Sequence, residues 1–197
     1  MPENLTTQAK TMDEISLSDF VPTSEPYEQS ENFYHGLYHL YNKNYSEARK
    51  YLVLAVNNTE PMDVTYFEYL SFLGLVEVLL HKSRGGLNRC YEASNGFSSI
   101  PELYINLAYA ELSLGNRRRC VVALENCIEK NPDFSHADQI INCSCLGKRK
   151  TSILKARKSI LKKLFRKNES QCLTETINEL FQLILIDKLK FYIQDRA

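Results

Sequence analysis

The sequence predicts an all-α protein, and three observations lead to this expectation. Apolar residues recur at i, i+3, i+4 and i+7 in one segment after another, which is the period of an amphipathic helix. No segment alternates apolar and polar residues in the way that a half-buried strand does. Pro101 and Gly115 stand at the start and the end of one such segment, where helices prefer these residues.

The first three helices are expected at residues 31–42, 46–58 and 64–82. The first two carry one apolar face each and are separated by a short polar connection, which is typical of a helical hairpin. The third segment is apolar on all sides, so we expect it to be buried on several sides.

A second pair of segments follows, at residues 85–96 and 101–115. The segment at 85–96 is a weaker helix, because Gly85 and Gly86 each cost about 1 kcal/mol relative to Ala in a helix interior. The segment at 101–115 begins with proline and ends at Gly115, the arrangement that helix ends prefer.

Two further helices are expected near the C-terminus. Residues 149–167 form a basic amphipathic segment, and residues 172–196 form an amphipathic segment with apolar residues on more than one face. A terminal helix this apolar needs cover, so it packs on the preceding helices or pairs with a second copy in a homodimer.

Composition places the chain among folded soluble proteins. It has 197 residues, 24 basic and 24 acidic side chains, and a formal net charge of zero. The N-terminus lacks the basic and apolar regions of a secretory signal, and six cysteines without such a signal are expected to be reduced thiols. These features predict a cytoplasmic protein.

The charges are unevenly distributed along the chain. Residues 1–31 carry seven acidic side chains and one lysine, whereas residues 139–168 carry ten Lys or Arg and no acidic residue. Residues 1–28 also contain three prolines and few apolar residues, which predicts an acidic, disordered tail.

A 34-residue spacing connects the central segments. Counting backwards from Pro132, large and small residues fall at fixed positions: Tyr104, Leu107, Ala108, Cys120, Leu124 and Cys127. One period earlier the same frame meets Leu70, Leu73, Gly74, Gly86, Cys90 and Ala93. A further step needs four extra residues, and it then meets Gly36, Ala48, Leu52 and Ala55. Small residues at such positions allow two antiparallel helices to approach closely.

This pattern resembles the tetratricopeptide repeat (TPR) family, whose unit is a helix–turn–helix. The resemblance implies a TPR-like α-α superhelix of about three repeats, at 29–62, 67–100 and 101–134, plus capping helices that include a degenerate fourth pair at 135–167. The sequence departs from the family pattern at Glu111, where an aromatic residue is usual, and at the two cysteines that replace alanines. An irregular helical bundle with a chance register is the alternative.

The resemblance also implies a concave binding face. Carried onto this sequence, the family's groove positions include an acidic edge at Glu68 and Glu102. The apolar members of the predicted groove are Phe33, Leu37, Leu40, Tyr41, Leu75, Val78, Leu79, Ile105, Tyr109 and Leu112. The Lys and Asn that hold a terminal carboxylate in some TPR proteins are absent, so an extended or helical segment with apolar anchors is the expected ligand. The alternative is that the protein's own C-terminal helix covers these residues.

The basic segment offers a competing binding surface. Its basic face, which could bind nucleic acid, anionic lipid or an acidic protein segment, consists of Lys155, Arg157, Lys158, Lys162, Lys163, Arg166 and Lys167. With a single aromatic residue in the segment, base stacking has little support. A capping helix with a solvated basic face is the alternative interpretation.

No catalytic or cofactor motif is present in the sequence. His35 and His39 are four residues apart, but neither the Glu of a zinc-protease helix nor a third ligand accompanies them. Cys143 and Cys145 are two apart, which separates their side chains by about 200° on a helix. We therefore expect no metal, no cofactor and no enzymatic activity.

The sequence thus predicts a non-enzymatic protein–protein interaction module, such as an adaptor, chaperone or assembly factor, that binds a peptide or helix in an apolar TPR groove. Two alternatives stay open. One is an electrostatic binder of nucleic acid or anionic membrane that uses residues 148–167. The other is a secretion chaperone of the TPR class. Such chaperones also combine about three repeats with a short acidic N-terminal segment, and this chain is similar to them in both features.

Overall fold

The computed structural model describes residues 29–134 and 167–195, and all regular elements in these residues are α-helices. The all-α prediction is therefore confirmed. The helices are α1 (Gln29–Tyr41), α2 (Tyr45–Asn57), α3 (Val64–His81), α4 (Arg84–Gly96), α5 (Pro101–Ser113), α6 (Arg117–Lys130) and α9 (Lys167–Asp195).

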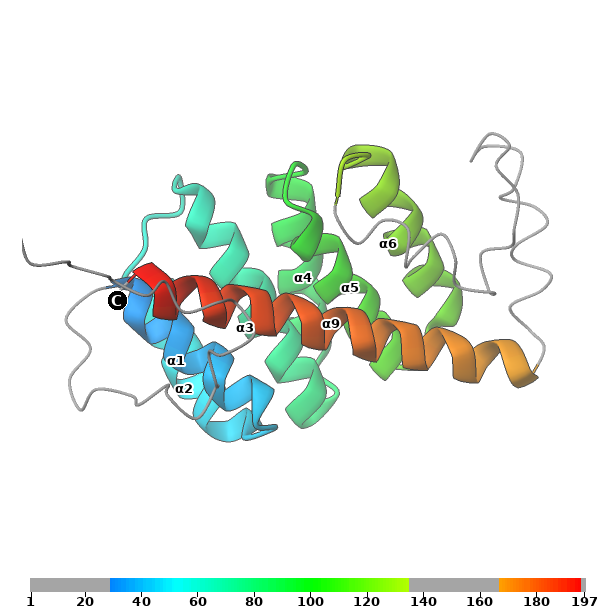
Figure 1. The fold of residues 1–197 in the computed structure, drawn as a ribbon, viewed down its shortest axis with the longest axis horizontal. Coiled ribbons are helices and arrows are strands. Elements are labelled where there is room, and N and C mark those ends of the chain that lie inside the picture. Colours follow the sequence, from blue (N-terminus) through cyan, green and yellow to red (C-terminus); the bar gives the residue numbers. More distant parts are fainter. Residues whose placement is uncertain (1–28, 135–166, 196–197) are drawn as a thin grey trace, which may run out of the picture.

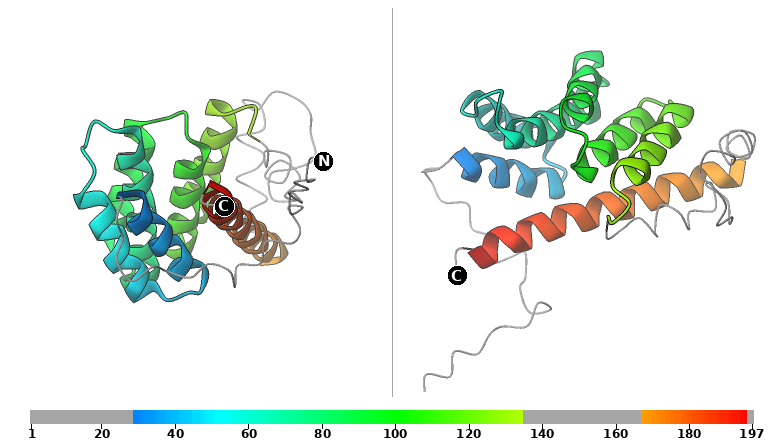
Figure 2. Two further views of the ribbon diagram at one scale, coloured as in Figure 1. Left: turned by 60° about the vertical axis from the view of Figure 1, so that its left-hand side comes forward. Right: turned by 90° about the horizontal axis from the view of Figure 1, so that it is seen from above.

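The first six helices form three antiparallel hairpins, α1–α2, α3–α4 and α5–α6, which stand side by side in chain order (Figure 1). Neighbouring hairpins pack through α2 against α3 and through α5 against both α3 and α4. Helix α9 lies across the stack, packed on α1 and α5, and its N-terminal end extends past α6 (Figures 1 and 2). The C-terminal helix thus covers one face of the three hairpins.

Local sequence accounts for the helix ends. The side chain of Asp63 accepts a hydrogen bond from the Thr65 amide (2.9 Å), and Ser83 Oγ accepts one from the Gly86 amide (3.2 Å). Both are N-cap interactions, and the second holds the glycine-rich first turn of α4 in helical form. Helix α5 ends before Gly115, whose φ of 79° lies in the left-handed region that glycine adopts without strain.

Helix α3 is the central helix of the core. Every residue from Tyr69 to Val78 is buried, as the sequence predicted for an all-round apolar helix. Within the described residues, α3 is also the one helix long and apolar enough to cross a membrane. Its packing against α2, α4 and α5, and the charged Glu77 within it, are those of a core helix in a folded domain.

Several predicted features lie outside the described residues. These are the acidic segment 1–28, almost all of the fourth helix pair at 135–167, Cys143 and Cys145, and the basic face from Lys155 to Arg166. Helix α9 begins at Lys167, five residues before the predicted start at 172. The added residues Lys167 to Gln171 are polar and include good helix formers, so they lengthen the helix without contributing to the apolar pattern that located it.

Candidate functional site

The predicted groove residues lie in the apolar core that the hairpins share with α9. Phe33, Leu37, Leu40, Leu75, Val78 and Ile105 are each at most 2% exposed. Tyr41, Leu79, Tyr109 and Leu112 are half-buried, and all ten belong to one apolar cluster that also contains residues of α9. Of the alternatives that the sequence left open for this face, the structure shows the one in which the C-terminal helix covers it.

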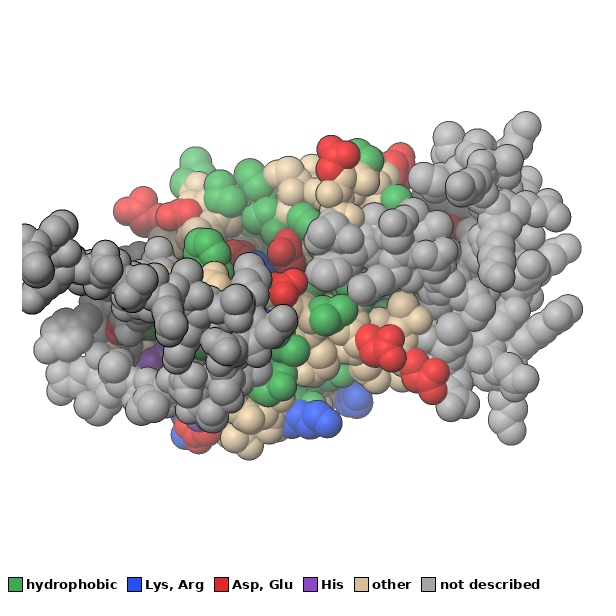
Figure 3. All heavy atoms as spheres, in the orientation of Figure 1, with side chains coloured by type: hydrophobic (Ala, Val, Ile, Leu, Met, Phe, Trp, Pro, Cys, Tyr) green, Lys and Arg blue, Asp and Glu red, His purple; other side chains and the backbone are tan. Residues whose placement is uncertain are grey.

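Helix α9 presents one apolar stripe to the hairpins. Its buried residues repeat at helical spacing: Leu173, Ile177, Leu180, Phe181, Ile184, Leu185, Leu189 and Tyr192. Outside this stripe α9 keeps some apolar surface: Leu183 and Ile186 on the opposite side are half-exposed, and Phe191, at the edge of the stripe near the C-terminal end, is 65% exposed. Figure 3 shows hydrophobic side chains among acidic ones on this side of the molecule. A homodimer through α9, which the sequence left open as an alternative, would use this outer side.

Phe181 is the aromatic contact in the middle of α9. Its ring meets Tyr109 of α5 edge-on, with 4.9 Å between ring centroids, and lies 6.4 Å from the ring of Phe72 in α3. Both separations fall within the range of favourable aromatic pairs. One side chain of α9 thus contacts both the second and the third hairpin.

Tyr192 makes the corresponding contact near the C-terminal end of α9. Its ring stacks on Tyr34 of α1, with centroids 4.1 Å apart and an angle of 21° between the ring planes. Phe181 and Tyr192 are eleven residues apart, so they lie on the same side of the helix, separated by about 16 Å along its axis. Together they fix both the position and the direction of α9 across the hairpins.

A charged contact lies between the two aromatic ones. Lys188 forms ion pairs with Glu68 of α3 and with Glu102 of α5, whose carboxylate oxygen lies 3.6 Å from Nζ. We call Glu68 and Glu102 the acid pair. Burial alone would lower the pKa of Lys188, but the two neighbouring carboxylates outweigh it and raise the pKa above its usual value. The lysine is therefore charged at neutral pH.

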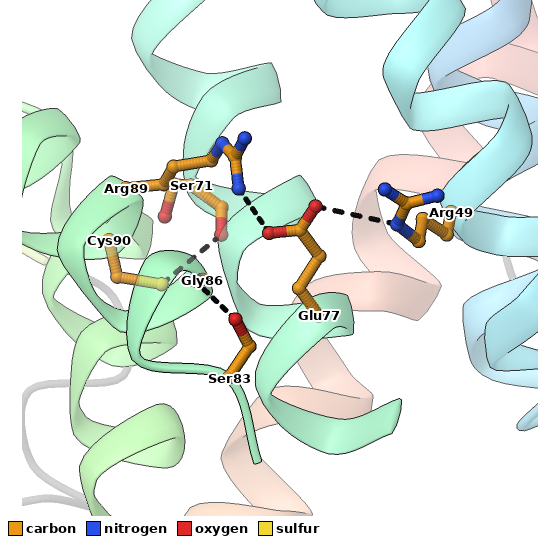
Figure 4. Close-up of polar contacts among 7 residues, drawn as sticks. All are labelled: Arg49, Ser71, Glu77, Ser83, Gly86, Arg89 and Cys90. Carbon is orange, nitrogen blue, oxygen red and sulfur yellow. Dashed lines mark hydrogen bonds and ion pairs between the residues drawn. The ribbon is translucent and has the colours of Figure 1, made fainter. Parts of the chain in front are cut away.

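A second polar cluster joins the first two hairpins on another part of the molecule (Figure 4). The buried carboxylate of Glu77 in α3 pairs with Arg89 of α4 and, at 3.4 Å, with Arg49 of α2. Both arginines reach the carboxylate from helices on either side, so a single buried charge connects three helices.

The third hairpin carries a similar buried carboxylate. Glu111 of α5 is 0% exposed, accepts a hydrogen bond from the Tyr91 hydroxyl of α4, and accepts a second from Asn116 Nδ2 at 2.7 Å. Burial, followed by the hydrogen bond to Glu111, raises the pKa of Tyr91 to about 12. Glu111 occupies the position where the sequence departs from the TPR pattern, and the structure shows that it is satisfied by polar partners.

The histidine pair of α1 packs against an aromatic ring. His39 stacks on Tyr51 (centroids 5.4 Å, interplanar angle 7°), and His35 meets the same ring edge-on at 5.2 Å. Burial lowers the pKa of both histidines. Among residues 29–134 and 167–195, no three His, Cys, Asp or Glu side chains form a group that could hold a metal.

Two contacts of α9 were missed by the sequence prediction. Tyr34 and Phe72 both contact α9, and both stand at the sixth position of their units, adjacent to the positions used to define the groove. The shared aromatic character of these equivalent positions was a signal in the sequence. The acidic edge at Glu68 and Glu102 was predicted, but its basic partner was not.

Comparison with protein-family models, with curated proteins and with solved structures finds no match to this chain. The geometry of the face that α9 covers is therefore the basis for a functional assignment.

Proposed function

We propose that this chain is a TPR-like protein–protein interaction module that binds an amphipathic helix on the face formed by α1, α3 and α5. The observation that carries the proposal is α9 itself, a helix held on this face by an aromatic contact, a charged contact and a second aromatic contact. Recognition of a helix through anchors on one side is a common mode of protein binding.

The packing within the hairpins supports the TPR-like part of the proposal. The small residues that the 34-residue frame places opposite each other are buried in all three hairpins: Gly36 with Ala48, Gly74 with Gly86, and Ala108 with Cys120. Stacked hairpins of this kind bury each other's apolar faces and leave one face for ligands.

The character of the face supports a helical ligand. It combines apolar and aromatic side chains with the acid pair, so it offers both burial and a directional charged contact. Proteins of such a type act by bringing partners together, and the adaptor, chaperone and assembly roles predicted from the sequence all use a surface of this kind.

Capture of partner proteins tests the proposal directly. The full chain would carry one protease site between residues 147 and 148, so that cleavage removes the covalent tether of α9 while both pieces remain present. Tethering gives a resident segment an effective concentration in roughly the millimolar range, which an external ligand must otherwise overcome. We expect cleaved protein to retain host proteins that intact protein does not.

A synthetic peptide of residues 167–195, the α9 peptide, provides the control. Added in excess, it is expected to release the captured proteins, whereas the same peptide with Phe181→Asp is expected to leave them bound. If no protein's retention depends on the α9 peptide, the face does not serve as a binding site for other proteins and the proposal is wrong.

A further inference from the structure

The charged contact beneath α9 is unbalanced. Two carboxylates, Glu68 and Glu102, face one ammonium group, that of Lys188, so the three side chains together retain one negative charge. All three side chains are largely covered, with 17%, 22% and 22% of their surfaces exposed. Water screens a charge at this depth less than it screens a surface charge, so a cation next to the acid pair is strongly stabilising.

The three anchors of α9 share one side of the helix. Phe181, Lys188 and Tyr192 follow each other at spacings of seven and four residues. At about 100° per residue, these spacings place the three side chains within about 20° of one direction. The same spacing on another helix would present an aromatic ring, a cation and a second ring to the same three places.

We infer that the acid pair determines which helices this face accepts, and that it selects an amphipathic partner helix carrying Lys or Arg seven residues after one aromatic anchor and four residues before a second. The inference rests on the proposed function and specifies the chemistry of the partner. Helix α9 is the resident helix with this pattern and competes with the partner for the face.

Selection follows from the cost of leaving the acid pair without a cation. A helix with a neutral residue at the Lys188 position would cover two carboxylates and neutralise neither, which costs more than the loss of an exposed ion pair. A helix with an acidic residue there would add a third negative charge. Specificity built on such repulsion rejects wrong partners even when their apolar surface fits.

The contacts also define the direction of the partner. Phe181 lies against Tyr109 of the third hairpin, whereas Tyr192 lies against Tyr34 of the first. A partner helix with the same order of anchors therefore runs from the third hairpin towards the first. The reversed order would place the second aromatic residue against Tyr109 and misalign the cation with the acid pair.

Binding of defined peptides tests the inference. The probes are the fluorescein-labelled α9 peptide and its Lys188→Met and Lys188→Glu variants. Each probe is mixed with increasing amounts of the cleaved full chain until it has exchanged with the resident C-terminal fragment, and its binding is measured by fluorescence anisotropy. We expect the affinity to fall by at least about tenfold for Lys188→Met, because one partner of a half-buried charge cluster is lost, and further for Lys188→Glu.

Charge exchange provides the matched control. Glu68→Lys combined with Glu102→Lys in the protein is expected to reverse the order of the peptides, so that the Lys188→Glu peptide binds more tightly than the wild-type peptide. Glu68→Gln combined with Glu102→Gln, which keeps the side-chain shapes, is expected to remove the discrimination. Circular dichroism of each variant checks that the hairpins remain folded.

The outcomes separate the inference from the proposed function. If all three peptides bind with equal affinity, helix binding stands and selection by the acid pair is wrong. If no peptide binds to folded, cleaved protein, both are wrong. Sedimentation of the intact chain tests whether α9 of a second copy occupies the face. We expect a monomer. A dimer that exchanges α9 would assign the face to self-association and overturn the partner inference.

Discussion

Gly74 of α3 and Gly86 of α4 bring two helix backbones into direct contact. A Cβ atom at either glycine would lie 2.6 Å from the carbonyl oxygen of the other. Such a distance is shorter than van der Waals contact, and a backbone oxygen in a packed hairpin cannot move aside as a flexible side chain does. The second hairpin therefore depends on the absence of side chains at this crossing.

We predict that Gly74→Ala and Gly86→Ala each lower the free energy of unfolding by about 1–3 kcal/mol, because the added methyl group forces the helices apart. Chemical denaturation followed by circular dichroism measures the effect. Gly85→Ala is the control: a Cβ atom there would meet only Ser83 Oγ, at 3.4 Å, so this variant is expected to be neutral or more stable. Equal destabilisation by all three variants would contradict the close crossing.

The sequence could predict this crossing because it depends on local spacing. Two small residues twelve apart, one on each helix of a hairpin, must face each other if the hairpin is closely packed. Helix positions were predictable for the same reason, since apolar periodicity is a property of each segment alone. The surroundings of a charge are not a local property, and they were predicted less well.

Glu77 illustrates that difference. In the sequence it is one acidic residue in an apolar run, whereas in the structure it pairs with Arg49 and Arg89 from two other helices. Similarly, Glu68 and Glu102 were predicted to form an acidic edge, but their partner Lys188 lies in a helix whose place on the hairpins no local pattern specifies. Long-range pairing of charges requires the tertiary structure.

We predict that Glu77→Gln destabilises the protein by about 1–3 kcal/mol, because the buried contact to two arginines loses its charge while both arginines keep theirs. The midpoint of urea denaturation is the measurement. Glu47→Gln is the matched control, since Glu47 forms an exposed ion pair with Lys50 and its loss should leave the midpoint unchanged. A similar midpoint shift in both variants would show that Glu77 does not join the helices.

The buried cysteines are expected to be unreactive in the folded protein. Cys90, Cys120 and Cys127 are each 0% exposed, and burial raises the pKa of Cys127 to about 12 and that of Cys90 further. Since the thiolate is the reactive form, iodoacetamide should modify these three residues only after unfolding in urea. Mass spectrometry resolves each site. Modification of Cys90 in native protein at the rate seen in urea would contradict the packing of α3 on α4.

The histidines of α1 predict a dependence of stability on pH. Burial lowers the pKa of His35 and of His39, so near their ordinary pKa of 6.5 the unfolded chain binds more protons than the folded protein. Their contribution to stability is therefore complete above about pH 6.5 and decreases as the pH falls below it. Thermal unfolding between pH 8 and pH 5 should show this decrease.

Variants identify the histidines responsible for that decrease. His35→Gln is expected to reduce the slope of the pH dependence, and His35→Gln combined with His39→Gln is expected to reduce it further. If both variants keep the same slope as the wild type, the burial of His35 does not contribute to the pH dependence.

Hydrogen exchange reports directly on whether α9 is docked on the face formed by α1, α3 and α5. An isolated helix exchanges its amides quickly in water, so slow exchange of residues 173–193 requires docking. We predict that this segment exchanges as slowly as α5 in the wild-type protein and in the control Asn178→Asp, which changes an exposed position of α9. Phe181→Asp should accelerate exchange in the segment by at least about tenfold while α3 and α4 remain protected. Rapid exchange of 173–193 in the wild-type protein would show that α9 is not docked on this face, and unchanged protection in Phe181→Asp would show that Phe181 does not hold it there.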